Sequence, residues 1–139
     1  MWRVLDHTAD VLLEVEAPSW AGLLEEAARA WGAWLSGGQE LGRTSFERTI
    51  EVQGSDAVEI WVHYWRRLHR LWTVEGALAI TADGEPLAVA GDSAVRVRCV
   101  PLETLDLARC VDVKAVTWHE ARVLERESGI WVGAIVLDL

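Results

Sequence analysis

The first long stretch of helical spacing lies between residues 20 and 35. Its apolar residues stand at offsets 0, 3, 4, 7, 8, 11, 14 and 15 from Trp20, and this spacing traces one face of a helix. Ser19 precedes the stretch and is a residue type that caps helix N-termini. Ser36-Gly37-Gly38 follows the stretch and predicts the end of the helix.

A second helix is predicted after Asp56. Asp56 and Glu59, three positions apart, form a start that resembles a capping box. The main apolar stripe then runs from Val58 to Trp72, and Gly76 predicts its end. Both stripes are wide, which favours helices that are covered on more than one side. Six of the nine tryptophans fall on these helices, and their spacing marks them as core residues.

The remaining apolar segments are short and predict β-strands. Residues 45–52 alternate, with Phe46, Ile50 and Val52 on one face and polar residues on the other. Asp83-Gly84 and Ser128-Gly129 are hairpin signals between neighbouring segments. The predicted strands are 3–7, 10–16, 45–52, 77–81, 87–90, 95–99, 113–124 and 130–137. This order predicts an α+β fold, in which two amphipathic helices pack with a mainly antiparallel β-sheet.

Composition narrows the class of protein and its partners. The length of 139 residues predicts one domain, residues 1–139, and a hydrophobic content of 51% is enough to form a core. A net charge of −9 argues against a protein that wraps a nucleic-acid backbone. No apolar run spans a membrane and no signal peptide is evident, so we expect a cytoplasmic protein without a membrane partner. Cys99 and Cys110 lack the second pair of a zinc site, which leaves buried reduced thiols or a disulfide.

The densest polar cluster is Asp6-His7-Thr8-Ala9-Asp10, between two predicted strands. Common catalytic templates are absent, because the sequence holds no GxxxxGKS/T, GxGxxG or GxSxG motif. The carboxylates of the cluster could present oxygen ligands to a hard cation, with His7 and Thr8 beside them. The alternative is a turn in which the Asp and Thr side chains hydrogen-bond to their own backbone.

The end of the sequence holds further carboxylates. Residues 130–139 are mostly apolar, but they end in Asp138 and then in Leu139, whose main-chain carboxylate would lie close by. Carboxylates are the hard oxygen donors that Ca²⁺, Mg²⁺ or Mn²⁺ prefers. If the last strand pairs beside the first strands, Asp10, Asp138 and the Leu139 carboxylate could converge on one ion. The alternative is a frayed, solvated chain end.

Two basic features complete the candidate set. Lys114 is the only lysine among thirteen basic residues, and its ammonium could meet a phosphate or a partner's carboxylate, or remain solvated. His63, Arg66, Arg67 and Arg70 share one face of the second predicted helix, at offsets 0, 3, 4 and 7. They could dock RNA or an acidic surface, or form the solvated face of an amphipathic helix.

Three motifs, in this order, resemble those of the archease family. They are the segment DHTAD at residues 6–10, the segment VKAVTWH at residues 113–119, and the ending VLDL at residues 136–139. Their spacing, the length of the chain and an Asp-initiated second helix also fit the family, so the resemblance spans nearly the whole sequence.

The resemblance implies a protein that is not itself an enzyme. Archeases are small cytosolic cofactors of the RtcB-type RNA ligase in tRNA splicing and RNA repair, where they promote guanylylation of the ligase by GTP and allow multiple turnover. The family's metal site matches Asp10, Asp138 and Leu139, which implies a divalent ion, Ca²⁺ in a crystal and Mg²⁺ or Mn²⁺ as alternatives. The activating lysine of the family matches Lys114. RNA would meet this protein only through the ligase.

The sequence also departs from the family pattern. Trp118 stands where the family has Tyr, and Leu139 stands where it usually has Ile. The second helix carries YWRRL at residues 64–68 in place of a WLNEL-like stretch. If this helix contacts the ligase, the pairing is expected to be specific to the cognate partner. The alternative functions are a general chaperone or RNA-associated binding module, and a metal-dependent hydrolase with His7 as base.

Overall fold

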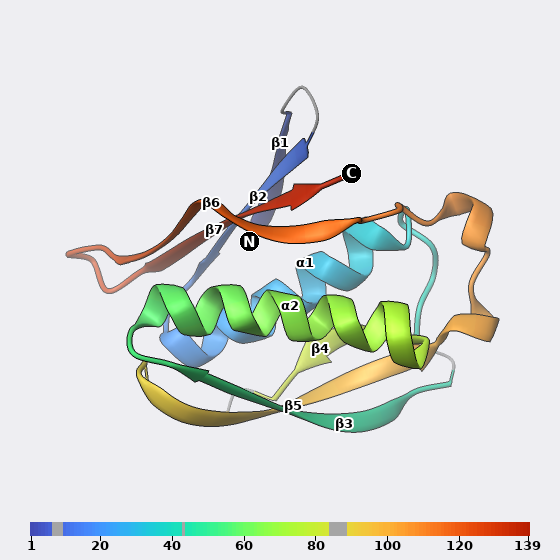
Figure 1. Ribbon diagram of the computed structural model, residues 1–139, viewed down its shortest axis with the longest axis horizontal. Helices are drawn as coiled ribbons and strands as arrows, with labels where there is room; N and C mark the ends of the chain where they lie inside the picture. The colour runs from blue at the N-terminus through green and yellow to red at the C-terminus, as the bar shows by residue number, and fades with distance from the viewer. Residues whose placement is uncertain (7–9, 43, 84–88) are drawn as a thin grey trace.

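Two antiparallel β-sheets enclose a layer of two helices, as the computed structural model in Figure 1 shows. The structure describes residues 1–6, 10–42, 44–83 and 89–139. Along the chain, two strands, a helix, a strand and a second helix are followed by four more strands. The predicted α+β class is therefore confirmed.

The larger sheet has four strands in the order β1-β2-β7-β6, and the smaller sheet has three in the order β3-β5-β4. The strands are β1 (Trp2–Asp6), β2 (Asp10–Ala17), β3 (Phe46–Gly54), β4 (Ala77–Ala82), β5 (Gly91–Pro101), β6 (Ala115–Glu125) and β7 (Trp131–Asp138). Neighbouring strands in both sheets pair antiparallel. The last strand of the chain thus lies in the middle of the larger sheet, beside the second strand.

The helices begin and end where their capping residues predict. α1 covers Trp20–Leu35, and the hydroxyl of Ser19 accepts a hydrogen bond of 2.9 Å from a main-chain N–H of its first turn. α2 covers Ala57–Glu75, and the carboxylate of Asp56 accepts a bond of 2.9 Å in the same way. Gly76 ends α2 with a φ of 63°, a left-handed conformation that glycine adopts without steric cost.

One cluster of buried side chains fills the space between the sheets. α1 packs on β4 and β2, while α2 packs on β3, β4 and β6. Trp31, Trp61 and Trp65 are its largest fully buried side chains, and Trp65 meets the other two edge to face. The indole N–H groups of Trp31 and Trp65 have no hydrogen-bond acceptor among the described residues. Edge-to-face contacts place the positive edge of one ring against the electron-rich face of another. These three tryptophans are core residues, as their spacing predicts.

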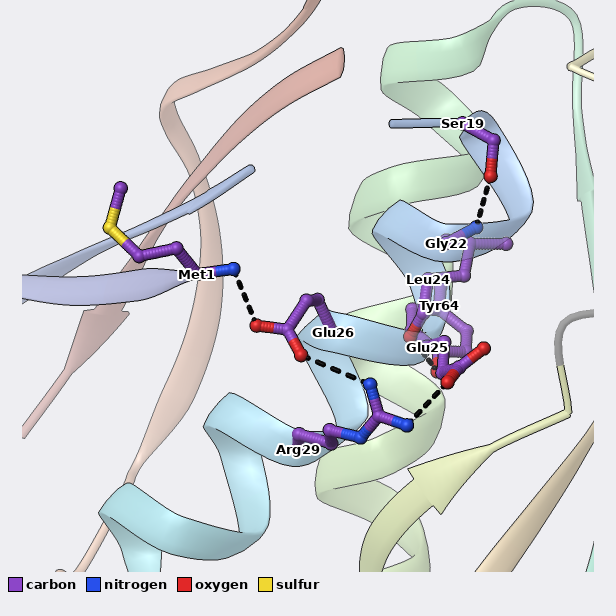
Figure 2. A network of polar contacts seen from close by, with 8 residues as sticks. All are labelled: Met1, Ser19, Gly22, Leu24, Glu25, Glu26, Arg29 and Tyr64. Atoms are coloured by element: carbon purple, nitrogen blue, oxygen red, sulfur yellow. Dashed lines mark hydrogen bonds and ion pairs between the residues drawn. The ribbon is translucent and has the colours of Figure 1, made fainter. Parts of the chain in front are cut away.

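A polar network ties the two helices to each other and to the start of the chain (Figure 2). The Met1 ammonium lies 2.7 Å from the Glu26 carboxylate, and Arg29 donates to the same carboxylate at 3.2 Å. Burial opposes the ionisation of Glu26, but these two cations outweigh it and hold the pKa of this carboxyl below its usual value. The buried Tyr64 of α2 donates its hydroxyl proton to a main-chain carbonyl of α1 at 2.7 Å. The helices are therefore joined by this hydrogen bond as well as by apolar packing.

The predicted strand at 87–90 is wrong in its described part. Residues 84–88 lie outside the described residues, and Val89 and Ala90 form a bend before β5 begins at Gly91. β4 pairs antiparallel with β5, and Ala82 is the register partner of Val97. The partner strand therefore lies further along the chain than the predicted 87–90, and Gly84 of the hairpin signal lies outside the described residues. The side chain of Val89 is 43% exposed, whereas β5 buries alternate residues. Alternation, and not apolar content, marks the strand here.

β6 departs from the prediction in its start and in its register. It begins at Ala115, two residues after the predicted start, and its pairing with β7 shifts between Thr117 and Arg122. Glu120 lies in the shifted segment with a φ of 57°. Such a bulge bends a strand and changes the direction of its side chains. The cysteines are free thiols; Cys99 is buried as predicted, but Cys110 is only half-buried.

Candidate metal site

The two candidate carboxylates lie on neighbouring strands at one end of the larger sheet. Asp10 begins β2, Asp138 ends β7, and the two residues are direct partners in the antiparallel register. Directly opposite residues in such a pair have Cβ atoms about 4.5–5.5 Å apart. Asp10 is half-buried and Asp138 is exposed. The structure therefore brings together two of the three predicted ligands from opposite ends of the chain.

The core side chains of β2 and β7 determine this register. Leu13 and Ile135 are direct partners, and both are completely buried against the helices. Because side chains alternate between the two faces of a strand, a slip of one residue would exchange the core-facing and outward-facing sets. It would also move the carboxylates of Asp10 and Asp138 out of step with each other. Hydrophobic burial in the middle of the sheet thus holds two acidic residues opposite each other at its end.

Lys114 is joined to the same place through the main chain. Its N–H donates a hydrogen bond of 2.8 Å to the carbonyl of Asp138, and the next residue, Ala115, is the register partner of Asp138 in β6. The Lys114 side chain is exposed, and it forms no ion pair with any described residue. The activating lysine that the resemblance implies therefore lies directly before β6, beside the end of β7 that carries Asp138.

The donor set at this end of the sheet suits a hard divalent cation. Two carboxylates in register offer oxygen ligands, and the main chain of Leu139 follows Asp138 directly. Within the described ranges, no group of three His, Cys, Asp or Glu side chains could hold a metal ion. A complete ligand set therefore needs groups beyond the Asp10 and Asp138 side chains, such as main-chain oxygens. His7 and Thr8, the other candidates near the site, lie outside the described residues.

The predicted basic face lies on α2, alongside β6. Arg66, Arg67 and Arg70 are exposed. His63 is half-buried, and its Nδ1 lies 2.6 Å from the carbonyl of Gln53 in β3. This histidine is therefore a packed contact between α2 and the smaller sheet as well as a member of the face.

Comparison with known protein families gives a match over nearly the whole chain. The model of the Archease protein family matches residues 2–139. The chain belongs to the archease family. The protein archease of Methanopyrus kandleri is 33% identical to it over an alignment of 144 residue positions. The alignment covers 99% of this chain and 99% of the relative.

Two solved structures share the archease fold. Protein 1598 of Methanobacterium thermoautotrophicum has a TM-score of 0.73 and 19% identity, covering 99% of this chain and 98% of the other. An archease of Thermotoga maritima, a possible chaperone, has a TM-score of 0.65 and 18% identity, covering 100% of this chain and 98% of the other. At this identity the likeness concerns the fold, and it confirms the arrangement of two helices with antiparallel sheets.

Asp10, Lys114 and Asp138, one residue from each archease motif, therefore lie together at one end of the sheet. One feature beside them was not predicted from the sequence. The sequence shows Trp118 only as a departure from the family's Tyr. In the structure its ring contacts Arg66 and His63 of α2. The sequence contains the tryptophan and the arginine-rich helix only as separate features, because their contact depends on the packing of α2 against β6.

A separate finding concerns membranes. No helix in the described part of the chain is long and apolar enough to cross one.

Proposed function

We propose that this protein is a non-catalytic, cytoplasmic activator of an RtcB-type RNA ligase in tRNA splicing and RNA repair. It would promote guanylylation of the ligase by GTP and so allow multiple turnover, meeting RNA only through the ligase. Membership of the archease family supports the proposal. The observation that carries it is the placement of Asp10 opposite Asp138, with the main-chain N–H of Lys114, the residue before β6, bonded to the carbonyl of Asp138.

The residues at the end of the sheet define what the protein would contribute. Asp10 and Asp138, with the main-chain oxygen of Leu139, would hold Ca²⁺, Mg²⁺ or Mn²⁺. Such an ion supplies positive charge that stabilises phosphates during nucleotidyl transfer. The pairing of β2 with β7 holds the two side-chain carboxylates together before the ligase binds. Lys114 adds a mobile ammonium, which suits a phosphate or a carboxylate of the ligase.

Removal of each carboxylate tests the proposed site. Asp10→Asn and Asp138→Asn keep the size of the side chain and remove its charge, so each should abolish stimulation of the purified ligase with GTP and Mn²⁺. Asp92→Asn is the matched control, because Asp92 is an exposed aspartate on β5 of the other sheet. It should stimulate like the wild type, and far-UV circular dichroism should show that all three variants fold. Full stimulation by both site variants would contradict the assignment of the carboxylates.

Ion binding by the protein alone provides a second measurement. Calorimetric titration with Ca²⁺ or Mn²⁺ should show binding that Asp10→Asn removes and Asp92→Asn retains. Lys114→Ala should lower stimulation of the ligase but leave ion binding unchanged. A wild-type protein that fails to stimulate its cognate ligase would overturn the proposed function. Hydrolysis of phosphoesters by this chain alone, with Mn²⁺ supplied, would favour the hydrolase alternative.

A further inference from the structure

Three neighbouring arginines lie on the exposed face of α2. Within the described part of the chain, Arg66, Arg67 and Arg70 form no ion pair. Several arginines on the strands differ, since Arg3 pairs with Glu14 at 2.6 Å, and Arg96 and Arg122 also have acidic partners. The chain carries 22 acidic residues, so carboxylates are plentiful. The fold nevertheless leaves these three cations together and open to solvent.

An exposed tryptophan lies beside these arginines. Trp118 is 45% exposed and belongs to the shifted segment of β6. The guanidinium carbon of Arg66 lies 5.7 Å from the centroid of its ring, and the His63 ring meets it edge to face at 5.8 Å. Arg66 also donates to the carbonyl of Val116 at 3.4 Å. These contacts orient the indole while nearly half of the side chain stays open to solvent.

The surface formed by His63, Arg66, Arg67, Arg70 and Trp118 is called the α2 cationic surface below. It continues into an open hollow between α2 and β3, to which Glu51 and Gln53 of β3 contribute. Only one carboxylate, that of Glu51, lies among the residues that line this hollow. The surface therefore combines positive charge, an oriented aromatic ring and a concave border.

We infer that the α2 cationic surface docks on an acidic patch of a partner protein. Tryptophan and arginine are the residues that most often dominate the binding energy of protein interfaces, and the unpaired arginines provide complementarity to carboxylates. An RNA strand fits less well, because its binding requires many cations along a continuous row of phosphates. Here three arginines stand in a protein of net charge −9. A discrete group of carboxylates matches the three cations without a long polyanion.

The inference rests on the proposed function, because the α2 cationic surface lies close to the candidate metal site. Trp118 stands three residues after Ala115, the register partner of Asp138, which corresponds to about 10 Å along a strand. A protein interface of ordinary size buries about 800 Å² on each partner. Asp138 faces away from the helices, whereas Trp118 faces α2, and the edge strand β6 lies between the two sides. A ligase that reaches Asp138 and extends around β6 would also cover the α2 cationic surface.

Charge reversal tests the electrostatic part of the inference. Arg67→Glu changes the α2 cationic surface by two charges, and Arg98→Glu makes the same change on β5 of the other sheet. Binding kinetics to the immobilised ligase would be measured at about 0.05 M and 0.5 M salt. We expect Arg67→Glu to lower the association rate constant about tenfold at low salt and little at high salt. We expect Arg98→Glu to bind like the wild type.

Truncation of the aromatic ring tests the packing part of the inference. Trp118→Ala should raise the dissociation rate constant about tenfold or more. Leu124→Ala is its matched control, because Leu124 is an apolar side chain on the same strand that is 59% exposed. Leu124→Ala should leave the dissociation rate constant unchanged. Equal effects of Trp118→Ala and Leu124→Ala would contradict a role for the indole.

The outcomes separate this inference from the proposed function. If the wild type stimulates the ligase but Arg67→Glu and Arg98→Glu bind alike, the inference fails and the proposed function stands. If the wild type neither binds nor stimulates the ligase, the proposed function fails and the inference fails with it. A fluorescent single-stranded RNA is the remaining probe. Binding of this RNA to the protein alone, weakened by Arg67→Glu but not by Arg98→Glu, would assign the surface to RNA and overturn the inference.

Discussion

Substitution of Gly133 by alanine should destabilise the fold at the contact between α2 and the larger sheet. Gly133 lies in β7, and the indole of Trp61 from α2 packs on its main chain. A Cβ at this position would stand 2.6 Å from Cζ2 of Trp61. Trp61 is completely buried, and its N–H donates a hydrogen bond of 2.9 Å to the carbonyl of the next residue in β7. The ring therefore has neither free space nor an unbonded edge.

The magnitude follows from this contact. Ordinary contact begins near 3.4 Å, so the indole must move by about 0.8 Å, which strains its packing and its hydrogen bond. Overpacking of this kind costs about 1–3 kcal/mol, and a weakened hydrogen bond adds up to about 1 kcal/mol. Alanine restricts the unfolded chain more than glycine does, which returns about 0.4–1 kcal/mol. We expect Gly133→Ala to lower the free energy of unfolding by about 1–3 kcal/mol and Tm by several degrees.

Urea denaturation followed by far-UV circular dichroism measures this loss. The midpoint should fall while the slope stays constant, because the folded surface hardly changes. Trp61→Phe supplies the control background, since the shorter ring leaves room for the new methyl group. Gly133→Ala should therefore cost at least about 1 kcal/mol less in that background than in the wild type. An equal cost in both backgrounds, or a wild-type midpoint for Gly133→Ala, would refute the proposed contact.

Two further predictions concern titratable side chains. Burial raises the pKa of the Cys99 thiol to about 11. Alkylation at about pH 8 should therefore modify the half-buried Cys110 first and reach Cys99 only after unfolding. Equal labelling of the two thiols in the folded protein would contradict this. The Met1 ammonium and Arg29 lower the pKa of Glu26 despite its burial. The ionised Glu26 carboxylate therefore stabilises the fold above the unfolded-state pKa of about 4.3, and this stabilisation is lost as the pH falls through the folded-state pKa. Thermal denaturation of Glu26→Gln should therefore show a loss of up to about 1 kcal/mol near neutral pH that disappears in acid; a loss that persists in acid would show that the charge is not its cause.

The helices could be predicted from sequence because their signals are local. Ser19 and Asp56 each cap a helix by a bond to a residue three positions away, and the apolar stripes repeat within each helix. The edges of the strands depend on partners far along the chain. The bulge in β6 is an example, since the pairing of Thr117 and Arg122 with β7 determines it. No pattern within residues 113–124 indicates that the register shifts there.

The candidate site shows the same division. Oxygen donors at residues 10 and 138 are visible in the sequence, and so is an apolar strand before Asp138. Their proximity is not visible, because it depends on the placement of β7 between β2 and β6. The archease resemblance implies that residues 10 and 138 belong to one site, and the pairing register of β2 with β7 explains how they come to lie side by side. The contact of Trp118 with Arg66 had neither a local pattern nor a family motif to indicate it.

α2 connects the two proposed surfaces mechanically. Its buried side holds β7 through the Trp61 indole, which bonds to the carbonyl of Ala134 four residues before Asp138. Its other side contacts the start of β6 and the residues before it: His69 lies 2.8 Å from the carbonyl of Val113, and Arg66 donates to the carbonyl of Val116 in β6. Because these bonds join one helix to both strands, the carboxylates and the α2 cationic surface stand in a fixed relation before any partner binds. Such preorganisation reduces the entropy lost on docking, and it suits the proposed function, in which this protein would present two carboxylates to the site of a ligase.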